Sequence, residues 1–161
     1  MTGSAKKAPR PARIPSFGRV IGYKIKGAGP EGAKVVLKVR PAHLNRSGVV
    51  HGGVLMTLLD VACSVAGQHV PPGEPPLLSA SISITTSFVG NVDKGTLIAT
   101  AQRTGGGKRI FFAKGEVRDA RGALIAQGEG VFRYRSPEAT AVAVSRARAA
   151  RRRTASSRSK R

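Results

Sequence analysis

The segment that decides the fold is NRSGVVHGG, residues 45–53, which leads into a mostly apolar stretch that continues to Gln68. Apolar residues occupy nearly every side of a helix in this stretch, at Val54, Leu55, Leu58, Leu59, Ala62, Val65 and Ala66. This distribution is typical of a helix wrapped by a sheet rather than one lying on a surface. Because prolines cannot continue helical hydrogen bonding, Val70-Pro71-Pro72-Gly73 ends the predicted helix near Gln68.

Two features of the predicted helix point to chemistry. Gly52 and Gly53 leave backbone N–H groups uncrowded where the helix begins, and free amides at this positive end suit a carbonyl oxygen that becomes negative. Asp60 is the only charged side chain between His51 and His69. Since an isolated buried carboxylate is costly to desolvate, its presence on so apolar a helix indicates a functional group.

The spacing of these groups predicts a dimer. Eight helical residues separate Gly52 from Asp60, which places them about 12 Å apart along the axis, too far to touch one carbonyl. If two copies pack with antiparallel helices, the Gly52 end of one subunit faces Asp60 of the other, and two equivalent sites form. An isologous homodimer is therefore part of the predicted mechanism.

The rest of the domain has the alternation of β-strands. Ala33, Val35, Leu37 and Val39 alternate with Lys34, Lys38 and Arg40, as in a half-buried strand. Ile82, Ile84 and Phe88 alternate with serines in the same way. Further strands are predicted at about 20–26, 96–103, 110–118 and 124–134, separated by Gly-rich turns. These patterns indicate a β-rich fold around one helix.

These residues resemble the hotdog-fold acyl-CoA thioesterases of the PaaI-like, phenylacetate-degradation type. The signature of that family is an Asn, a short Gly-containing turn, His-Gly-Gly, and an Asp well inside the following helix, and 45–60 matches it at each position. The resemblance covers about Phe17 to Tyr134 and departs at Asn91, where the family often has Pro. It implies an α+β hotdog fold, an antiparallel sheet of five to six strands wrapped around one long central helix.

The resemblance also implies roles for single residues. Asp60 would be the catalytic carboxylate, which deprotonates a water or attacks directly to give a mixed anhydride. Gly52 would donate its N–H to the thioester carbonyl, with Gly53 beside it in substrate binding. Asn45 and His51 would shape this donor end, His51 by fixing the turn with a hydrogen bond or, alternatively, as a proton carrier.

Two further sets of residues complete the expected site. The family places a small hydroxyl residue near the Asp to hold the attacking water; Ser81 aligns with it, and Ser79 and Ser83 share its strand face. Coenzyme A carries phosphates, for which the candidates are Lys108, Arg109 and Arg103 around the glycines 105–107. Exposed charges at a strand end are the alternative interpretation of these three. The expected substrate is a coenzyme A thioester, and no other cofactor is expected.

Metal and thiol chemistry are not expected. His43 and His69 lack metal-ligand spacing with His51 or with a Cys, so no metal is predicted. Cys63 is interpreted as a small apolar residue on a packed helix, because nothing beside it would activate a thiolate.

Charge divides the chain of 161 residues into three parts. Residues 1–13 carry four basic residues and no acid, 14–136 carry sixteen against seven, and 137–161 carry eight against Glu138, giving +4, +9 and +7. Both ends are predicted to be disordered around the 14–136 hotdog domain. The basic tail would bind the phosphates of nucleic acid or another anionic surface, or else only aid solubility, since it has no aromatic residues for base stacking.

The compartment and the competing function classes follow from what the sequence lacks. No stretch is long and apolar enough to span a bilayer and no secretion signal begins the chain, so a cytoplasmic protein is expected, with a transit peptide as the alternative. A ligand-sensing hotdog protein that binds acyl-CoA without turnover and touches nucleic acid with its tail is the non-enzyme alternative. A hotdog hydratase is the enzyme alternative, although no His lies between Asp60 and Gln68 to pair with the acid.

The resemblance also implies that dimers can pair further into tetramers, as is common in the family.

Overall fold

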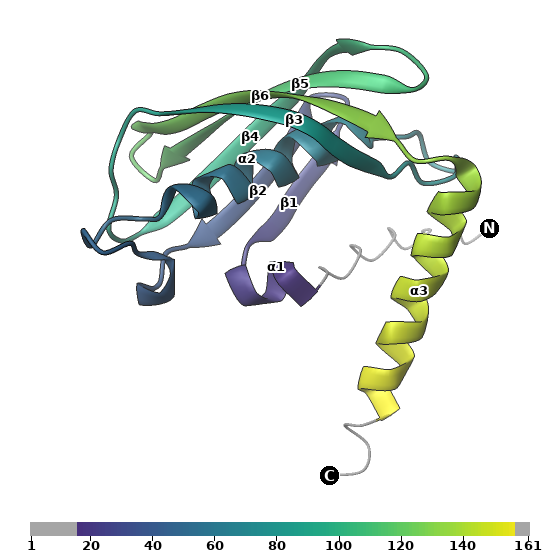
Figure 1. Ribbon diagram of the computed structural model, residues 1–161, viewed down its shortest axis with the longest axis horizontal. Helices are drawn as coiled ribbons and strands as arrows, with labels where there is room; N and C mark the ends of the chain where they lie inside the picture. The colour runs from purple at the N-terminus through teal and green to yellow at the C-terminus, as the bar shows by residue number, and fades with distance from the viewer. Residues whose placement is uncertain (1–15, 157–161) are drawn as a thin grey trace, which may run out of the picture.

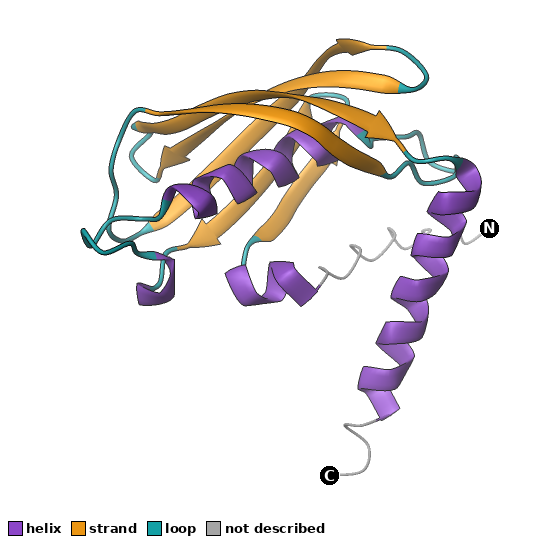
Figure 2. Ribbon diagram, in the orientation of Figure 1, coloured by secondary structure: helices purple, strands orange, loops and turns teal. Residues whose placement is uncertain are grey.

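Helix α2 (Gly52–Gly67) lies along one face of a six-stranded antiparallel sheet (Figures 1 and 2). The computed structural model describes residues 16–156, so the segment 1–13 lies outside the described residues. The strands are β1 (Lys24–Gly29), β2 (Gly32–Lys38), β3 (Ser79–Phe88), β4 (Thr96–Gly106), β5 (Ile110–Asp119) and β6 (Leu124–Tyr134). Their order across the sheet is β1-β2-β4-β5-β6-β3, which makes β1 and β3 the edges.

The predicted helix and most of the predicted strands are confirmed, with bounds that move by a few residues. The prediction of a strand over 20–26 is wrong in its first half, because helix α1 (Ser16–Ile21) ends there and β1 begins at Lys24. The carbonyls of Val20 and Ile21 accept hydrogen bonds from Arg40, and His43 also contacts the Ile21 carbonyl. A helix of six residues that depends on partners about twenty positions away leaves no periodic signal of its own.

The core forms where α2 enters the curved sheet. Leu58 and Leu59 are fully buried on the helix, and each contributes about 1.5–3 kcal/mol by leaving water. Phe111 of β5 stacks on Phe132 of β6 with ring centroids 5.0 Å apart. The helix approaches these rings so closely at Gly67 that a Cβ atom there would overlap Phe111. The packing therefore requires glycine where α2 ends.

One stripe of α2 faces away from this core. Gly53 and Met56 are exposed, and Thr57, Asp60 and Ser64 are half-buried, at the three- and four-residue spacings of a single helix face. The sequence predicts a helix that is apolar on nearly every side and wrapped by the sheet, and this stripe is the side that the sheet leaves uncovered. Among the described residues, the stripe lies beside the edge strand β3, where Ser81 forms a hydrogen bond with Asp60.

Helix α3 (Pro137–Ser156) corrects the prediction that the segment 137–161 is disordered; residues 157–161 lie outside the described residues. Proline suits the first position of a helix, the Ser136 hydroxyl accepts a hydrogen bond from the Ala139 N–H at 3.2 Å, and Glu138 lies in the first turn. Ala and Arg, which dominate α3, are strong helix formers, and the prediction considered only burial. In Figure 1, α3 extends away from the sheet. No helix in residues 16–156 is long and apolar enough to cross a membrane.

Candidate active site

The N-terminus of α2 carries one backbone donor without a partner among the described residues. His51 is the N-cap, and its Nδ1 accepts a hydrogen bond from the Gly53 N–H at 2.9 Å. The His51 carbonyl accepts from the N–H groups of Val54 and Leu55. The Gly52 N–H is left over, and it points out of the positive end of the helix dipole. Gly53 was also predicted to bind substrate, but its N–H is occupied by His51.

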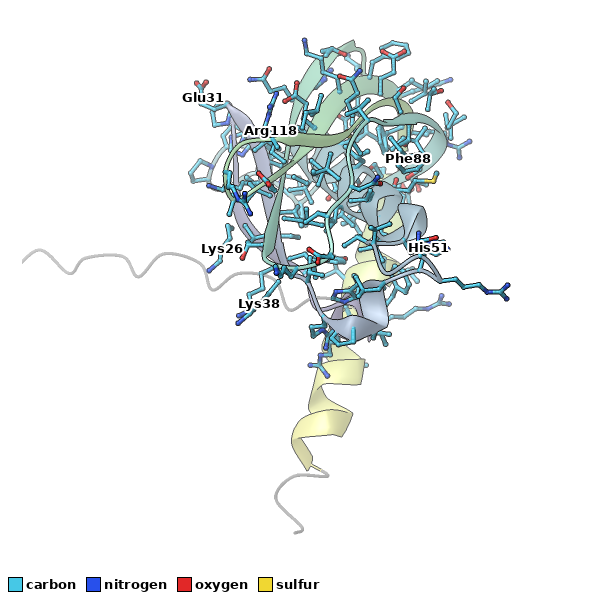
Figure 3. All side chains as sticks on the ribbon, turned by 90° about the vertical axis from the view of Figure 1, so that its left-hand side faces the viewer. Lys26, Glu31, Lys38, His51, Phe88 and Arg118 are labelled. Atoms are coloured by element: carbon cyan, nitrogen blue, oxygen red, sulfur yellow. The ribbon has the colours of Figure 1, made fainter. Side chains whose placement is uncertain are left out.

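An aromatic ring limits the space at this donor. The Phe88 ring, at the end of β3, has its Cζ 3.2 Å from where a Cβ atom on Gly52 would lie. Phe88 is 52% exposed, so its other face is open. Figure 3 shows Phe88 and His51 on the same side of the molecule, beside the beginning of α2. Sequence reasoning placed Phe88 on β3 but did not place it in the site.

The loop before α2 is fixed by Asn45. Its Oδ1 accepts hydrogen bonds from the Ser47 N–H at 2.8 Å and the Val49 N–H at 3.3 Å, and its own N–H donates to the Val49 carbonyl. These bonds fold the loop back on itself without occupying the Gly52 N–H. Asn45 and His51 therefore lie where the sequence places them, at the donor end of the helix.

Buried His43 holds the N-terminal end of α2 in place, a role that sequence analysis did not find. Its Nδ1 accepts from the Arg40 N–H at 3.0 Å, so the ring proton is on Nε2, which donates to the Ile21 carbonyl at 2.9 Å. The His43 carbonyl accepts from the His51 N–H at 2.8 Å. His43 thus links α1, through its ring, to the capping residue of α2, through its carbonyl. In the sequence, His43 is a lone histidine outside any motif, so nothing marks it as a structural residue.

Asp60 lies about two turns after Gly52 along α2, where it contacts Ser81 of β3. The Ser81 hydroxyl donates to Asp60 Oδ1 at 2.5 Å. Ser79, two residues earlier on the strand, instead exchanges a hydrogen bond with Ser64 at 2.9 Å, and Gln68 donates to both. Of the serines considered from the sequence, Ser81 is therefore the one that contacts the carboxylate.

The prediction that Ser83 shares the face of Ser81 is wrong. The β3–β6 pairing shifts register between Ser81 and Ser83, which makes Ile82 a bulge. An extra residue in the strand inverts the alternation beyond it. Ile84 accordingly packs against the core, while Ile82 is 56% exposed. The bulge is what allows a hydroxyl at Ser81 and an apolar side chain at Ile84 to face the same helix.

The negative charge of Asp60 acts on its buried neighbours. Burial, and then the charge of Asp60, raises the pKa of the Cys63 thiol to about 12. The same two causes raise the pKa of the buried Tyr23 hydroxyl. A protonated, fully buried thiol is no nucleophile, so Cys63 acts as an apolar packing residue.

The basic candidates lie at the other end of the helix. Lys108 and Arg109 form the β4–β5 turn, and Arg103 on β4 donates through Nε to the Gly105 carbonyl at 3.2 Å. All three are exposed. The Arg109 carbonyl accepts from the Tyr134 N–H, and the Tyr134 hydroxyl donates to the Gly67 carbonyl at the end of α2. Within one chain, these residues are therefore separated from Gly52 by the whole length of the helix.

Among residues 16–156, the depression that the structure shows lies apart from these groups. A broad depression is lined by the polar face of the sheet that points away from α2, including Thr85, Gln102, Glu116 and Glu129, and none of the candidate site residues line it. Gly52 and Asp60 instead lie along the exposed stripe of α2, on the opposite face of the sheet from this depression. In residues 16–156, no three His, Cys, Asp or Glu side chains are grouped so that they could hold a metal ion.

Comparisons with known proteins assign the family. The model of the thioesterase superfamily matches residues 47–126, which include Gly52, Asp60 and Ser81. Acyl-coenzyme A thioesterase 13 of Mus musculus is 30% identical over 118 residues, covering 72% of this chain and 83% of the mouse protein.

Solved structures agree in fold and length. A conserved protein of Pseudomonas aeruginosa superposes with a TM-score of 0.70 at 26% identity, covering 76% of this chain and 95% of that one. The Escherichia coli PaaI protein from the phenylacetic acid degradation operon superposes with a TM-score of 0.67 at 25% identity, covering 74% and 83%. The chain therefore belongs to the thioesterase superfamily, as a hotdog-fold hydrolase of the PaaI-like type.

Proposed function

We propose that the protein is an acyl-CoA thioesterase whose two identical sites form between subunits of a homodimer. Each site takes the Gly52 N–H from one subunit and the Asp60 carboxylate from the partner subunit. The observation that carries the proposal is the exposed stripe of α2, which presents a carboxylate held by Ser81 on the same helix that begins with a free N–H. Similarity to the mouse acyl-CoA thioesterase supports the substrate class.

Two contacts within the chain support the same symmetry axis. Antiparallel packing of two α2 helices about Met56 puts Gly52 opposite Asp60 of the partner subunit. Antiparallel pairing of two β3 strands between Ile84 and Thr85 puts Phe88 opposite Ser81 of the partner subunit. Because Phe88 contacts Gly52 and Ser81 contacts Asp60 within each chain, one two-fold axis satisfies both arrangements.

The surface around this axis suits a partner. Strand β3 is an edge with unpaired backbone groups, and an exposed edge with apolar side chains is a template for another strand. Ile82 is 56% exposed on β3 and Met56 is 38% exposed on α2. Joining two β3 edges would bury both side chains and extend the sheet across the dimer.

The chemistry follows from the charges at the two ends. The thioester carbonyl accepts a hydrogen bond from the Gly52 N–H, and the helix dipole, equivalent to about half a positive charge, stabilises the oxyanion as it forms. Asp60 of the partner subunit removes a proton from a water, and the hydroxide adds to the carbonyl carbon. The tetrahedral intermediate then collapses and expels the coenzyme A thiolate. A thiol with a pKa of about 8.5 leaves with little help from an acid.

Ser81 supports the water route over direct attack by Asp60. Its hydroxyl donates to one carboxylate oxygen and keeps lone pairs that can accept from a water beside the other oxygen. A single turnover in H₂¹⁸O distinguishes the routes. Water attack places the label in the released acid and leaves intact enzyme without an acyl adduct in rapid-quench mass spectrometry, whereas label in the Asp60 carboxylate or an acyl adduct on Asp60 would contradict the water route and establish a mixed anhydride.

The phosphates of coenzyme A would be bound by Lys108, Arg109 and Arg103 of the partner subunit. Antiparallel packing carries the Gly67 end of one α2 beyond the Gly52 end of the other, and the β4–β5 turn lies beside Gly67. The three cations thus approach the open end of the site, on the side from which a long substrate enters.

The decisive experiment measures thiol release from aryl-, short- and medium-chain acyl-CoAs by the parent, Asp60→Asn and Asp93→Asn. Asp93 is an exposed acid in the β3–β4 connection, so its variant makes the same change of charge outside the site. Turnover by the parent and Asp93→Asn that collapses in Asp60→Asn supports the proposal. Binding of acyl-CoA without turnover by the parent would overturn it in favour of a ligand-sensing protein.

A further inference from the structure

Helix α3 is a basic element that the proposed hydrolysis does not use. Among the described residues it makes no extensive contact with the sheet or with α2, and most of its described side chains are exposed. Of the α3 side chains that the structure describes, only Thr140, near the start of the helix, is buried. In Figure 1 it leaves the domain after β6 and extends into solvent. A helix placed in this way is available to a partner.

The charge of this segment is of one sign. From Ala139 to Arg161 there are eight basic residues and no acid, and five of them, Arg146, Arg148, Arg151, Arg152 and Arg153, fall within α3. Successive positions turn by about 100° around a helix, so Arg148, Arg151 and Arg152 fall on one side of the axis and Arg146 and Arg153 on the opposite side. The helix therefore carries basic positions on two opposite sides, with a neutral side formed by the positions of Ala143, Ala147 and Ala150 between them.

We propose that α3 binds duplex DNA through its phosphates, without reading the base sequence. An α-helix has a diameter of about 10–12 Å with its side chains, close to the width of about 12 Å of the major groove. The alanines between the arginines keep the helix slim. Arginines on two opposite sides of the axis can reach the phosphates on both walls of the groove, and each neutralised phosphate releases counterions.

The composition of α3 argues against the other polyanions. A helix that lies on a membrane needs a broad apolar face with large side chains, and Pro137–Ser156 has only Ala and Val as apolar residues. Single strands are bound by stacking bases on aromatic rings, and this segment has none. The major groove of duplex RNA is deep and narrow, which excludes a helix. Duplex DNA is the polyanion that fits a slim helix with arginines on two opposite sides.

The test compares two full-length variants with equal loss of charge. The first changes the five arginines of α3 to Gln, which is neutral and keeps the helix. The control changes five exposed lysines of the domain to Gln: Lys24, Lys26, Lys34, Lys38 and Lys94. Both variants must retain thiol-release activity and the parent's oligomeric state, which verifies that the domain is folded. Binding to a fluorescent 25-bp duplex of arbitrary sequence is followed by anisotropy from 50 to 300 mM KCl.

The parent is expected to bind the duplex with a steep salt dependence. Each lost phosphate contact lowers the magnitude of the slope of log K against log salt by about 0.9, so the loss of five arginines should lower it by up to about 4.5. Its affinity at 100 mM KCl should fall at least about 100-fold, while the lysine control changes by less than about tenfold.

Three results would overturn the proposal. Equal losses in the two variants would mean that total charge, not α3, attracts the DNA. Affinity for a 25-nucleotide single strand equal to that for the duplex would contradict binding in the groove. Binding to vesicles with 30% anionic lipid, without binding to the duplex, would assign α3 to a membrane surface instead.

Discussion

The Phe88 ring packs against the backbone of Gly52, with Cζ 3.2 Å from the position of a Cβ atom on that glycine. Any side chain at residue 52 must therefore move the ring, whose exposed half leaves it room to yield. This contact makes it possible to separate two properties of Gly52, its lack of a side chain and its free N–H. The two properties can be removed one at a time.

Gly52→Pro should abolish the donor while keeping the helix. Proline is favoured at the first helical position, and His51 before it, with φ −64° and ψ 135°, already has the extended backbone that a residue before proline requires. Loss of one oxyanion donor lowers kcat by about 10²–10³-fold. Gly52→Ala adds a Cβ but keeps the N–H, so steady-state thiol release should show a loss of less than about tenfold. Equal losses in the two variants would mean that crowding against Phe88, and not the N–H, accounts for the effect.

Ser81→Ala should lower kcat with little change in KM. The Ser81 hydroxyl hydrogen-bonds to a carboxylate, and such bonds contribute about 1.5–3 kcal/mol, which corresponds to roughly 10–100-fold in rate. Ser81→Thr keeps the hydroxyl and should recover most of the loss. Ser79→Ala is the matched control, because Ser79 bonds to Ser64 on the same strand face. A Ser79 variant as slow as the Ser81 variant would indicate a general defect of β3.

The sequence was sufficient where the structure depends on local pattern. Helix α2 and the alternating strands were predictable, because burial on one side repeats at a fixed period along the chain. The Ser81–Asp60 contact was also within reach, since a hydroxyl beside the carboxylate was expected on that strand. Two alternatives, Ser79 and Ser83, shared the same apparent face.

What was missed depends on events that periodicity does not record. The bulge at Ile82 inverts the alternation of β3 and removes Ser83 from the site, and nothing in a run of serines marks a bulge. Buried His43 is tied to Ile21 across 22 positions, so its contribution appears only when the loops are folded. Gly53 looked equivalent to Gly52 until the ring of His51 occupied its N–H.

Deprotonation of Cys63 should lower the free energy of unfolding at alkaline pH. Its thiol has its pKa raised from 9.0 to about 12 by burial and by Asp60, so the folded state keeps the proton after the unfolded state has released it. The associated stability is complete below pH 9 and is lost as pH rises from 9 towards 12. The free energy of unfolding should therefore fall by up to about 1.4 kcal/mol per pH unit in that window from this group.

Urea unfolding of the parent and Cys63→Ala at pH 8 and pH 10.5 measures this contribution. The variant loses the thiol but keeps Tyr23, whose pKa is also raised, so only the part due to Cys63 should disappear. The difference between parent and variant should shrink by about 2 kcal/mol or less between the two pH values. A constant difference would mean that the thiol titrates alike in the folded and unfolded states.

Mixing two inactive variants should restore activity if each site is shared between subunits. Asp60→Asn lacks the carboxylate and Gly52→Pro lacks the donor, so each homodimer has two defective sites. In a heterodimer, the intact Gly52 of the first variant faces the intact Asp60 of the second, and the other site carries both defects. Co-expression with two different affinity tags, followed by sequential purification, gives heterodimers whose kcat should approach half of the parent value per dimer. A site contained within one chain predicts no recovery at all, because neither subunit then has both groups, and that result would exclude the two-fold arrangement drawn from Met56 and from the pairing of β3.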